Sequence, residues 1–263
     1  MRSLWTHWRR VADDLTLRPR LLLLLDFDGT LAPLEDAPHL ARLSARTKTR
    51  IKRLKERCGV DVAIVSGRSI ANIRRRVGLR SVYYAGNHGL EIEGPGLSFT
   101  HPVAAALKPA LTDLAAAVRR DIRVLPGVFV ENKGMTLSIH YRRLAARRVK
   151  ELEGVVRTLR VRTRGLPFKW RTGHKVWELV PAVEWDKGCA ALYLIRQLGR
   201  PFPLALGDDR TDEDMFRALL KKGITVRIGP RQPTRAVYGL ASQAETDRFL
   251  AALESCLMES GRC

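Results

Sequence analysis

The stretch Leu21–Leu31 reads LLLLLDFDGTL: five leucines, two aspartates one residue apart, then glycine, threonine and leucine. An uninterrupted apolar run is typical of a strand in a parallel sheet that helices cover on both faces. In such sheets, ligands bind beyond the carboxyl ends of the strands. The stretch therefore predicts a buried strand that presents Asp26 and Asp28 at a site. The aspartates could instead cap the segment that follows, but one cap needs only one aspartate.

The composition is that of a globular protein. With 263 residues, of which 45% are hydrophobic, the chain can form one large domain or a core with a smaller inserted domain. The four cysteines lack the paired spacing of a zinc site and predict reduced thiols. The leucine run is shorter than the apolar region of a signal peptide, and no stretch approaches the length of a transmembrane helix. We therefore expect a cytoplasmic protein with no membrane association.

The formal net charge of +20 permits two interpretations. One is nucleic-acid binding through phosphate contacts. The other is an enzyme for an anionic substrate, which the positive field would attract. Lysine and arginine are spread through predicted helices, such as residues 48–57 and 142–150, and do not gather in a groove with aromatic side chains. The sequence therefore favours the enzyme and argues against a nucleic-acid partner.

Two further predicted strands end in polar residues. Residues 60–65 lead into Ser66-Gly67-Arg68 and a helix, where a hydroxyl and backbone N–H groups suit a phosphate. Residues 203–206 lead into an acidic cluster, whose repulsion a cation would offset. Because all the available ligands are oxygen atoms, we expect Mg²⁺ rather than Zn²⁺. The predicted metal ligands are Asp26, Asp28, Asp208, Asp209 and Asp212.

The alternation of strand and helix stops near Gly94 and resumes near residue 183. Between them the sequence predicts an antiparallel sheet with helices, which is an α+β module. Its predicted elements are helices over residues 103–120 and 145–159 and strands over 124–130, 135–141, 168–170 and 175–180. The predicted domains are a core of residues 1–93 and 183–263 and a second domain of residues 94–182.

One mechanism uses the polar residues at all these strand ends. Asp26 would attack the phosphorus of a phosphate ester to give an aspartyl-phosphate, with Mg²⁺ held by Asp26, the Asp28 backbone carbonyl and Asp208. Ser66 and Lys187 would hold the other phosphoryl oxygens. Asp28 would protonate the leaving alkoxide and then activate the hydrolytic water.

At these residues the sequence resembles the haloacid dehalogenase-like (HAD) phosphatases. The four motifs of that superfamily correspond to Asp26–Thr30, Ser66, Lys187 and Gly207–Asp209. Within it the sequence is most similar to the trehalose-6-phosphate phosphatase family. The stretches that carry this similarity are 66–68, 85–89, 130–134, 140–142, 186–188 and 207–213. The resemblance covers nearly the whole chain and implies an α/β fold: a Rossmann-like core with a parallel sheet and an α+β cap inserted after the second motif.

The resemblance implies a Mg²⁺-dependent phosphatase that hydrolyses trehalose 6-phosphate to trehalose and phosphate, functionally linked to a trehalose-6-phosphate synthase. On the cap, Glu131, Lys133 and Glu178 would bind hydroxyls of the glucose distal to the phosphate. The other implied substrate-binding residues are Gly67, Arg68, Arg142 and Lys175.

Three alternatives remain open. The catalytic motifs do not identify the leaving group, so the substrate could be sucrose phosphate or mannosyl-phosphoglycerate. A phosphotransferase or mutase would share Asp26, and a nucleic-acid-binding protein could use a HAD fold.

His88, between two turn residues after a predicted strand over 81–85, is expected to be structural rather than an acid–base catalyst.

Overall fold

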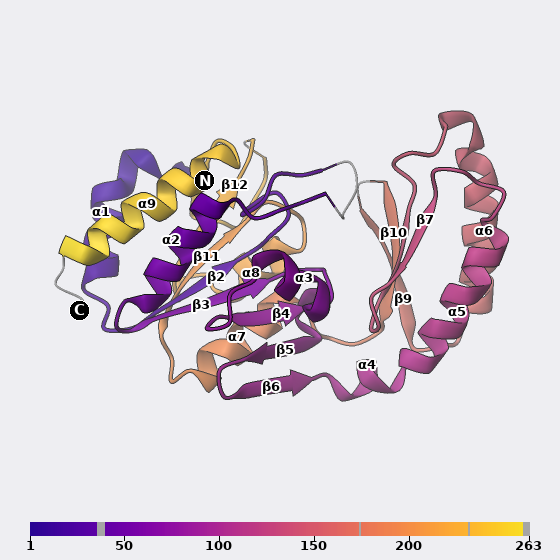
Figure 1. Cartoon of the computed structure of the whole chain (residues 1–263), viewed down its shortest axis with the longest axis horizontal. Coiled ribbons are helices and arrows are strands. Elements are labelled where there is room, and N and C mark those ends of the chain that lie inside the picture. The colour runs from indigo at the N-terminus through magenta and orange to yellow at the C-terminus, as the bar shows by residue number, and fades with distance from the viewer. Residues whose placement is uncertain (36–39, 174, 231, 260–263) are drawn as a thin grey trace. The chain divides into compact units, whose positions relative to one another are not determined.

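A computed structural model describes residues 1–35, 40–173, 175–230 and 232–259. The chain forms two compact units. Met1–Phe99 and Trp185–Cys263 make up the first, which we call the core unit, and Thr100–Glu184 make up the second, the inserted unit. Figure 1 traces the chain through both.

The core unit is built on a nine-stranded sheet with the strand order β1-β13-β12-β11-β2-β3-β4-β5-β6. From β1 to β4 along this order all neighbours pair in parallel, and β5 pairs antiparallel with β4. The strands are β1 (Arg2–Ser3), β2 (Leu21–Leu25), β3 (Val60–Val65), β4 (Tyr83–Gly86), β5 (Glu91–Gly94), β6 (Leu97–Thr100), β11 (Phe202–Gly207), β12 (Ile224–Ile228) and β13 (Tyr238–Leu240). The predicted α/β class with a parallel sheet is confirmed.

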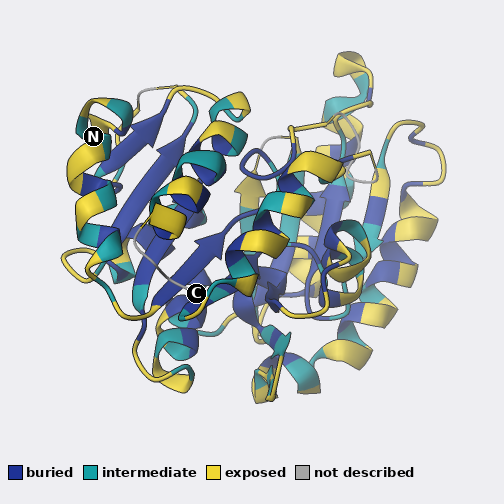
Figure 2. Cartoon of the chain, turned by 60° about the vertical axis from the view of Figure 1, so that its left-hand side comes forward, coloured by how far each residue is buried: buried dark blue, intermediate teal, exposed yellow. Residues whose placement is uncertain are grey.

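Helices cover both faces of this sheet, so that its central strands are buried (Figure 2). One face packs against α1 (Trp8–Thr16), α2 (Ala45–Glu56), α3 (Ile70–Val77) and α9 (Ala244–Glu259), and the other against α7 (Lys187–Gln197) and α8 (Asp212–Ala218). The leucines of β2 alternate between the two cores: Leu21, Leu23 and Leu25 join the first, Leu22 and Leu24 the second. Because both faces are apolar, the strand has no polar position. The predicted buried strand is confirmed.

Three residues of the core unit begin or end helices through their own hydrogen bonds or conformation. The Ser44 hydroxyl accepts a hydrogen bond from the backbone N–H of Thr47 (3.0 Å) and caps α2. Asp186 caps α7 by accepting from the N–H of Cys189 (2.9 Å). Gly78 ends α3 in the left-handed conformation, with φ 62°.

The inserted unit is a four-stranded antiparallel sheet, in the order β7-β8-β10-β9, with helices against one face. Its strands are β7 (Phe129–Asn132), β8 (Leu137–His140), β9 (Phe168–Gly173) and β10 (Val176–Pro181), and its helices are α4 (Pro102–Ala106), α5 (Lys108–Asp121) and α6 (Val149–Arg162). Alternate strand residues, such as Ile139 and Trp177, pack against α5 and α6 in one apolar core. The other face of the sheet carries polar side chains.

The structure differs from the sequence-based expectation at three places. The helix expected over residues 103–120 is divided into α4 and α5, because Pro109 would lack a hydrogen-bond donor inside a continuous helix. The apolar pattern of residues 1–20 predicts a short helix, but the segment begins with β1, an edge strand too short to show a pattern. The boundary predicted at residue 94 falls at the end of β5, whereas the compact inserted unit begins at Thr100, because β6 still belongs to the large sheet.

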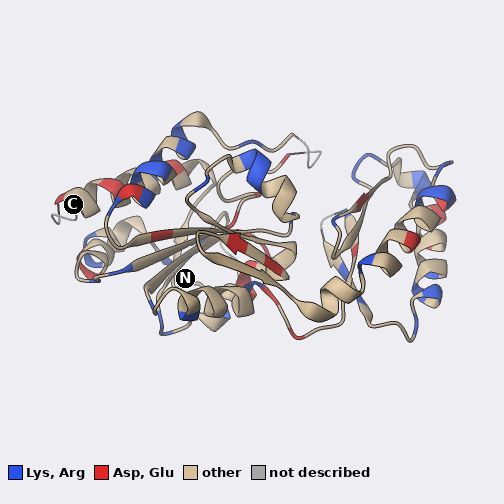
Figure 3. Ribbon diagram, turned by 60° about the horizontal axis from the view of Figure 1, so that its bottom comes forward, with Lys and Arg blue, Asp and Glu red and all other residues tan. Residues whose placement is uncertain are grey.

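Lysine and arginine residues are distributed over helices of both units (Figure 3). None of the described helices is long and apolar enough to cross a membrane. Among the described cysteines, Cys189 and Cys256 have free thiols. Cys58 is disulfide-bonded, so the prediction of reduced thiols is wrong for this residue.

Candidate active site

Three neighbouring strands of the core unit end beside one another, and each leads into a predicted site residue. Asp26 follows β2, Ser66 follows β3 and Asp208 follows β11. The N–H of Asp26 donates to the carbonyl of Leu206 (3.0 Å), which extends the pairing of β2 with β11 by one residue. The parallel sheet therefore gathers residues that are far apart in the sequence at one edge.

Lys187, the first residue of α7, lies between two aspartates. Its Nζ donates to Oδ1 of Asp26 and to Oδ1 of Asp212, both at 2.7 Å. All three side chains are buried. Burial lowers the pKa of Lys187, but Asp212 and Asp26 outweigh it and raise the pKa well above the ordinary value. The lysine is therefore a fixed positive charge in the site.

The loop from Asp208 to Asp212 is held by its own carboxylates. Oδ2 of Asp212 accepts from the backbone N–H groups of Asp208 (2.9 Å) and Asp209 (3.0 Å). Oδ1 of Asp209 accepts from the N–H and the hydroxyl of Thr211, both at 2.8 Å, and from the N–H of Asp212 (3.1 Å). The hydroxyl of Thr30 donates to Oδ1 of Asp208 (3.2 Å). These bonds fix the direction of each carboxylate.

The acidic residues repel one another in a site with little water. Burial raises the pKa of Asp26, with Lys187 acting against it and Asp208 adding to it. Burial, then Asp212 and Asp209, raise the pKa of Asp208 to about 7. Burial and Asp26 also raise the pKa of Asp212. Asp209 differs: against the effect of burial, Lys187 and the hydrogen bond from Thr211 lower its pKa to about 2.

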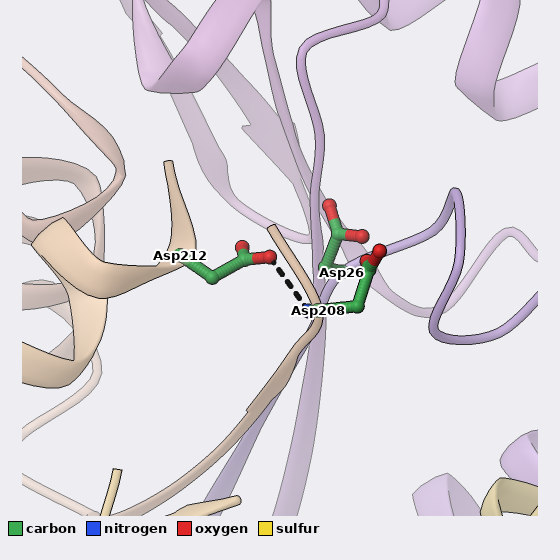
Figure 4. Close-up of side chains that lie close together, drawn as sticks. All are labelled: Asp26, Asp208 and Asp212. Carbon is green, nitrogen blue, oxygen red and sulfur yellow. Dashed lines mark hydrogen bonds between the residues drawn. The ribbon is translucent and has the colours of Figure 1, made fainter. Parts of the chain in front are cut away.

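Asp26, Asp208 and Asp212 offer carboxylate oxygens that lie within 4.8 Å of one another. Figure 4 shows Asp26 and Asp208 side by side, with Asp212 directed toward them from α8. A hard divalent cation such as Mg²⁺ prefers oxygen ligands, and it would neutralise the repulsion that raises the pKa of Asp208. The residues present therefore fit such an ion. Of the five predicted ligands, the carboxylates of Asp28 and Asp209 lie outside this cluster of three.

The Asp28 carboxylate is bound by Arg68. Nε and Nη2 of Arg68 donate to its two oxygens at 2.7 and 2.6 Å, in the bidentate geometry typical of a strong ion pair. Nη1 of Arg68 donates to Asn72 on α3 (3.3 Å). Arg68 is buried, whereas the side chain of Asp28 is 34% exposed. The pair joins the two loops that follow β2 and β3.

Ser66 and Gly67 form the turn between β3 and α3. Ser66 is buried, and its hydroxyl accepts from the N–H of Arg68 (3.2 Å). Gly67 lies against the ring of His88: a Cβ on Gly67 would be 2.6 Å from Cε1. Gly29, with φ 84°, is equally constrained, because a Cβ there would meet the Asp208 carboxylate. Both glycines allow the close approach of a neighbouring side chain to the backbone.

The predicted residues of the inserted unit lie on the polar face of its sheet. Nζ of Lys133 donates to Oε1 of Glu178 (2.8 Å), which also accepts from the hydroxyl of Ser138 (2.7 Å). Oε2 of Glu131 is 3.1 Å from Nε2 of His140. The strand register aligns Glu131, Ser138 and Glu178 across β7, β8 and β10. They form one row because directly paired residues share a face.

Arg142 and Lys175 lie apart from this row. Both are exposed, and the ammonium of Lys175 is 5.8 Å from the centre of the Tyr141 ring. Sequence reasoning missed Ser138 and Arg171, of which Arg171 extends the row onto β9 opposite Glu178. Only the register between strands could have revealed them. Sequence reasoning gave Thr30 no role of its own, although Thr30 lies in the Asp26–Thr30 motif and its hydroxyl donates to Asp208.

The fold and the acidic site define a HAD-like protein. A haloacid dehalogenase-like hydrolase from Bacteroides thetaiotaomicron has this fold, with a TM-score of 0.63 and 19% identity over 90% of this chain and 98% of that chain. A crystal structure titled as a trehalose-6-phosphate phosphatase related protein is more similar, with a TM-score of 0.79 and 25% identity over 90% of this chain and 99% of that chain.

The chain belongs to the trehalose-phosphatase family, whose sequence model matches residues 24–245. Trehalose-phosphate phosphatases of Mycobacterium marinum and Mycobacterium tuberculosis are 38% and 36% identical to it over 259 and 261 residues. Each match covers 95% of this chain but 65% of the relative, so the chain spans just under two thirds of the length of these proteins. The predicted family is confirmed.

Proposed function

We propose that this protein is a Mg²⁺-dependent phosphatase that hydrolyses trehalose 6-phosphate through an aspartyl-phosphate on Asp26. The observation that carries the proposal is the position of Lys187, in contact with both Asp26 and Asp212, beside the carboxylate of Asp208. A buried cation and a set of carboxylates suited to a metal can bind a phosphoryl group and concentrate positive charge where the transition state becomes negative. Family membership supports the reaction.

Asp26 supplies the nucleophile in this mechanism. One carboxylate oxygen bonds to phosphorus while the bond from phosphorus to the sugar oxygen breaks, which leaves the phosphoryl group on Asp26. The other oxygen accepts from Lys187, which keeps the carboxylate in a fixed orientation. Asp26, Asp208 and Asp212 would hold the metal, with Asp209 and the Asp28 carbonyl as the other predicted ligands. When bound, the ion would act as a Lewis acid toward a phosphoryl oxygen.

Asp28 transfers the proton in this mechanism. As the acid it protonates the sugar alkoxide, and as the base it takes a proton from the water that attacks the aspartyl-phosphate. Free phosphate then leaves and Asp26 is regenerated. Both oxygens of the Asp28 carboxyl group accept hydrogen bonds from Arg68, and a guanidinium can only donate. Arg68 must therefore turn away from Asp28, toward the phosphate, before Asp28 carries a proton.

Ser66 and Lys187 would bind the remaining phosphoryl oxygens, with Gly67 allowing the close approach of the loop. The sugar would be recognised by the polar face of the inserted unit, through Glu131, Lys133 and Glu178, with Arg142 and Lys175 as further candidates. Carboxylates and an ammonium suit hydroxyls, which both donate and accept. The links of Lys133 and Ser138 to Glu178 support this assignment, because they orient the carboxylate before any ligand binds.

We also infer a cytoplasmic location and a functional link to a trehalose-6-phosphate synthase. Charged groups cross the apolar interior of a bilayer only at high cost, so a sugar phosphate is hydrolysed where it is made. The reaction that supplies this substrate must then run in the same compartment.

The test is a phosphate-release assay with trehalose 6-phosphate, sucrose phosphate, mannosyl-phosphoglycerate and glucose 6-phosphate, each with Mg²⁺ and with EDTA. Trehalose 6-phosphate should be the best substrate, and EDTA should abolish turnover. Asp26→Asn should lower kcat by about three orders of magnitude or more, whereas Asp14→Asn on the surface of α1 should leave it unchanged.

Three outcomes would contradict parts of the proposal. Turnover of trehalose 6-phosphate no faster than that of glucose 6-phosphate would refute the assignment of the sugar. Capture of beryllofluoride, a mimic of the aspartyl-phosphate, at a residue other than Asp26 would refute the nucleophile. Salt-sensitive nucleic-acid binding without any turnover would favour the binding protein instead.

A further inference from the structure

The turn Asn87–Gly89, which follows β4, has an unfavourable backbone. Its three residues have φ angles of 49°, 59° and 93°, all in the left-handed region. This region disfavours residues other than glycine, and two of the three are not glycine. A backbone of this kind persists where the surrounding structure fixes it, and such places cluster at functional sites.

One side of the turn holds the loop Ser66–Arg68. The N–H of His88 donates to the carbonyl of Ser66 (3.0 Å), and the N–H of Asn87 donates to the carbonyl of Arg68 (2.7 Å). The ring of His88 lies against Gly67 between them. The turn therefore fixes the backbone on both sides of Gly67, and with it the direction of the Ser66 hydroxyl and the Arg68 side chain.

The other side of the turn is anchored beside Lys187. Nε1 of Trp185 donates to the carbonyl of Gly89 (2.7 Å). A Cβ on Gly89 would lie 2.3 Å from the Cβ of Ala190 on α7, so the turn packs directly on the first turn of that helix. The indole of Trp185 stacks on Phe99, with ring centres 4.9 Å apart. Trp185 is two residues from Lys187, so its hydrogen bond connects the turn to the segment that carries the lysine.

A second anchor joins the turn to α3. Nδ2 of Asn87 donates to Oε1 of Glu91 (2.7 Å), and the same oxygen accepts from the N–H of Ile70 at the start of α3 (2.9 Å). The two anchors act on different ends of the turn, Asn87 and Gly89.

We propose that Trp185 is a positioning residue of the phosphatase centre. Through Gly89 it holds the left-handed turn, and the turn sets the loop Ser66–Arg68 relative to Lys187, so that both can bind oxygens of one phosphoryl group. The inference rests on the proposed function. His88 is buried in this turn with its ring against Gly67, and we expect it to contribute to the shape of the turn.

The test compares Trp185→Phe with Trp5→Phe. Trp185→Phe keeps an aromatic ring against Phe99 but removes the N–H that donates to the carbonyl of Gly89. Trp5→Phe removes a comparable hydrogen bond, from the indole N–H to Glu245 (3.1 Å), elsewhere in the core unit. Because small displacements of binding groups have large effects on rate, Trp185→Phe should lower kcat roughly tenfold. The loss should be equal for trehalose 6-phosphate and for an aryl phosphate, because the phosphoryl group is common to both.

Binding of inorganic phosphate in the presence of Mg²⁺, measured by calorimetry, gives a readout that does not depend on turnover. Its affinity should fall about as much as kcat in Trp185→Phe and stay unchanged in Trp5→Phe. Glu91→Gln, which weakens the second anchor, should act in the same direction. A Trp185→Phe protein with wild-type kcat and phosphate affinity would overturn the proposal, even if its melting temperature were lower.

A loss confined to trehalose 6-phosphate would also overturn it, since it would place Trp185 in sugar recognition. If the wild-type protein hydrolyses neither ester, the proposed function fails. The phosphate titrations of Trp185→Phe and Trp5→Phe then still decide whether Trp185 positions a phosphate site.

Discussion

Removing the buried cation of the site should destabilise the protein strongly. In Lys187→Met the side chain keeps its length but loses the charge that contacts Asp26 and Asp212, each at 2.7 Å. A hydrogen bond to a charged group contributes about 1.5–3 kcal/mol, so two such bonds contribute roughly 3–6 kcal/mol. This range agrees with the loss of about 3–5 kcal/mol that follows when one partner of a buried ion pair is removed. We therefore expect the free energy of unfolding to fall by about 4 kcal/mol at pH 8.

The loss should depend on pH in a definite direction. Burial already raises the pKa values of Asp26 and Asp212, and Lys187 opposes the rise in both. Without the lysine both pKa values rise further. A carboxyl whose pKa is higher in the folded than in the unfolded state stabilises the fold at low pH and loses that contribution as the pH rises. The difference between Lys187→Met and the wild type should therefore shrink from pH 8 toward pH 5.

Urea denaturation followed by circular dichroism, in EDTA, measures this effect. Lys55→Met is the matched control, because Lys55 forms an ion pair with Asp61 (3.0 Å) that is more exposed; it should cost no more than about 1 kcal/mol. Adding Asp212→Asn to Lys187→Met should recover part of the loss, since an amide oxygen can still accept from the Asp208 and Asp209 backbone. If Lys187→Met costs no more than Lys55→Met, the buried triad does not stabilise the fold as argued.

Three further predictions concern the substrate and the metal. Arg68→Met should raise KM about tenfold for trehalose 6-phosphate and for an aryl phosphate alike, because a guanidinium released from Asp28 would bind the phosphate; an effect on one ester alone would contradict this. Glu178→Ala should raise KM about tenfold for trehalose 6-phosphate only, with the exposed Glu151→Ala as control; equal losses on both esters would place Glu178 outside sugar recognition. In EDTA, Asp208 with a pKa of about 7 binds a proton that the unfolded chain releases near its ordinary value of 3.8. The contribution of Asp208 to stability is therefore lost as the pH rises through 7, so the melting temperature should fall between about pH 5 and pH 8. Mg²⁺ should reduce that fall because it binds the ionised carboxylate. A melting temperature that does not change with pH in EDTA would contradict the raised pKa.

The parts of the fold that the sequence could predict are those that depend on neighbouring residues. Five consecutive leucines specify a strand covered on both faces, and Ser44, Asp186 and Gly78 specify helix ends through their own conformations and hydrogen bonds. The residues at the ends of β2, β3 and β11 could also be selected, because parallel strands bring their carboxyl ends to one edge of the sheet. Local chemistry was sufficient for each of these inferences.

The parts that could not be predicted depend on pairing between distant segments. The row of Ser138, Glu178 and Arg171 exists only through the register of three strands, which no single stretch of sequence encodes. The same holds for β1, whose two residues acquire a partner only when β13 is beside them. In each case the missing information is the distance between residues far apart in the chain.

The two kinds of residue also divide the chemistry between the units. Asp26, Lys187 and Asp208 all belong to the core unit, and in the proposed mechanism they act on a phosphoryl group that every phosphate ester shares. The row through Glu178 belongs to the inserted unit, which holds none of these three residues. In the proposed mechanism the residues that follow the leucine strand carry the phosphoryl transfer, and we expect a change of sugar specificity to require changes in the register-dependent row of the inserted unit. That division is why the reaction could be inferred from short motifs, whereas the choice of sugar has to be measured.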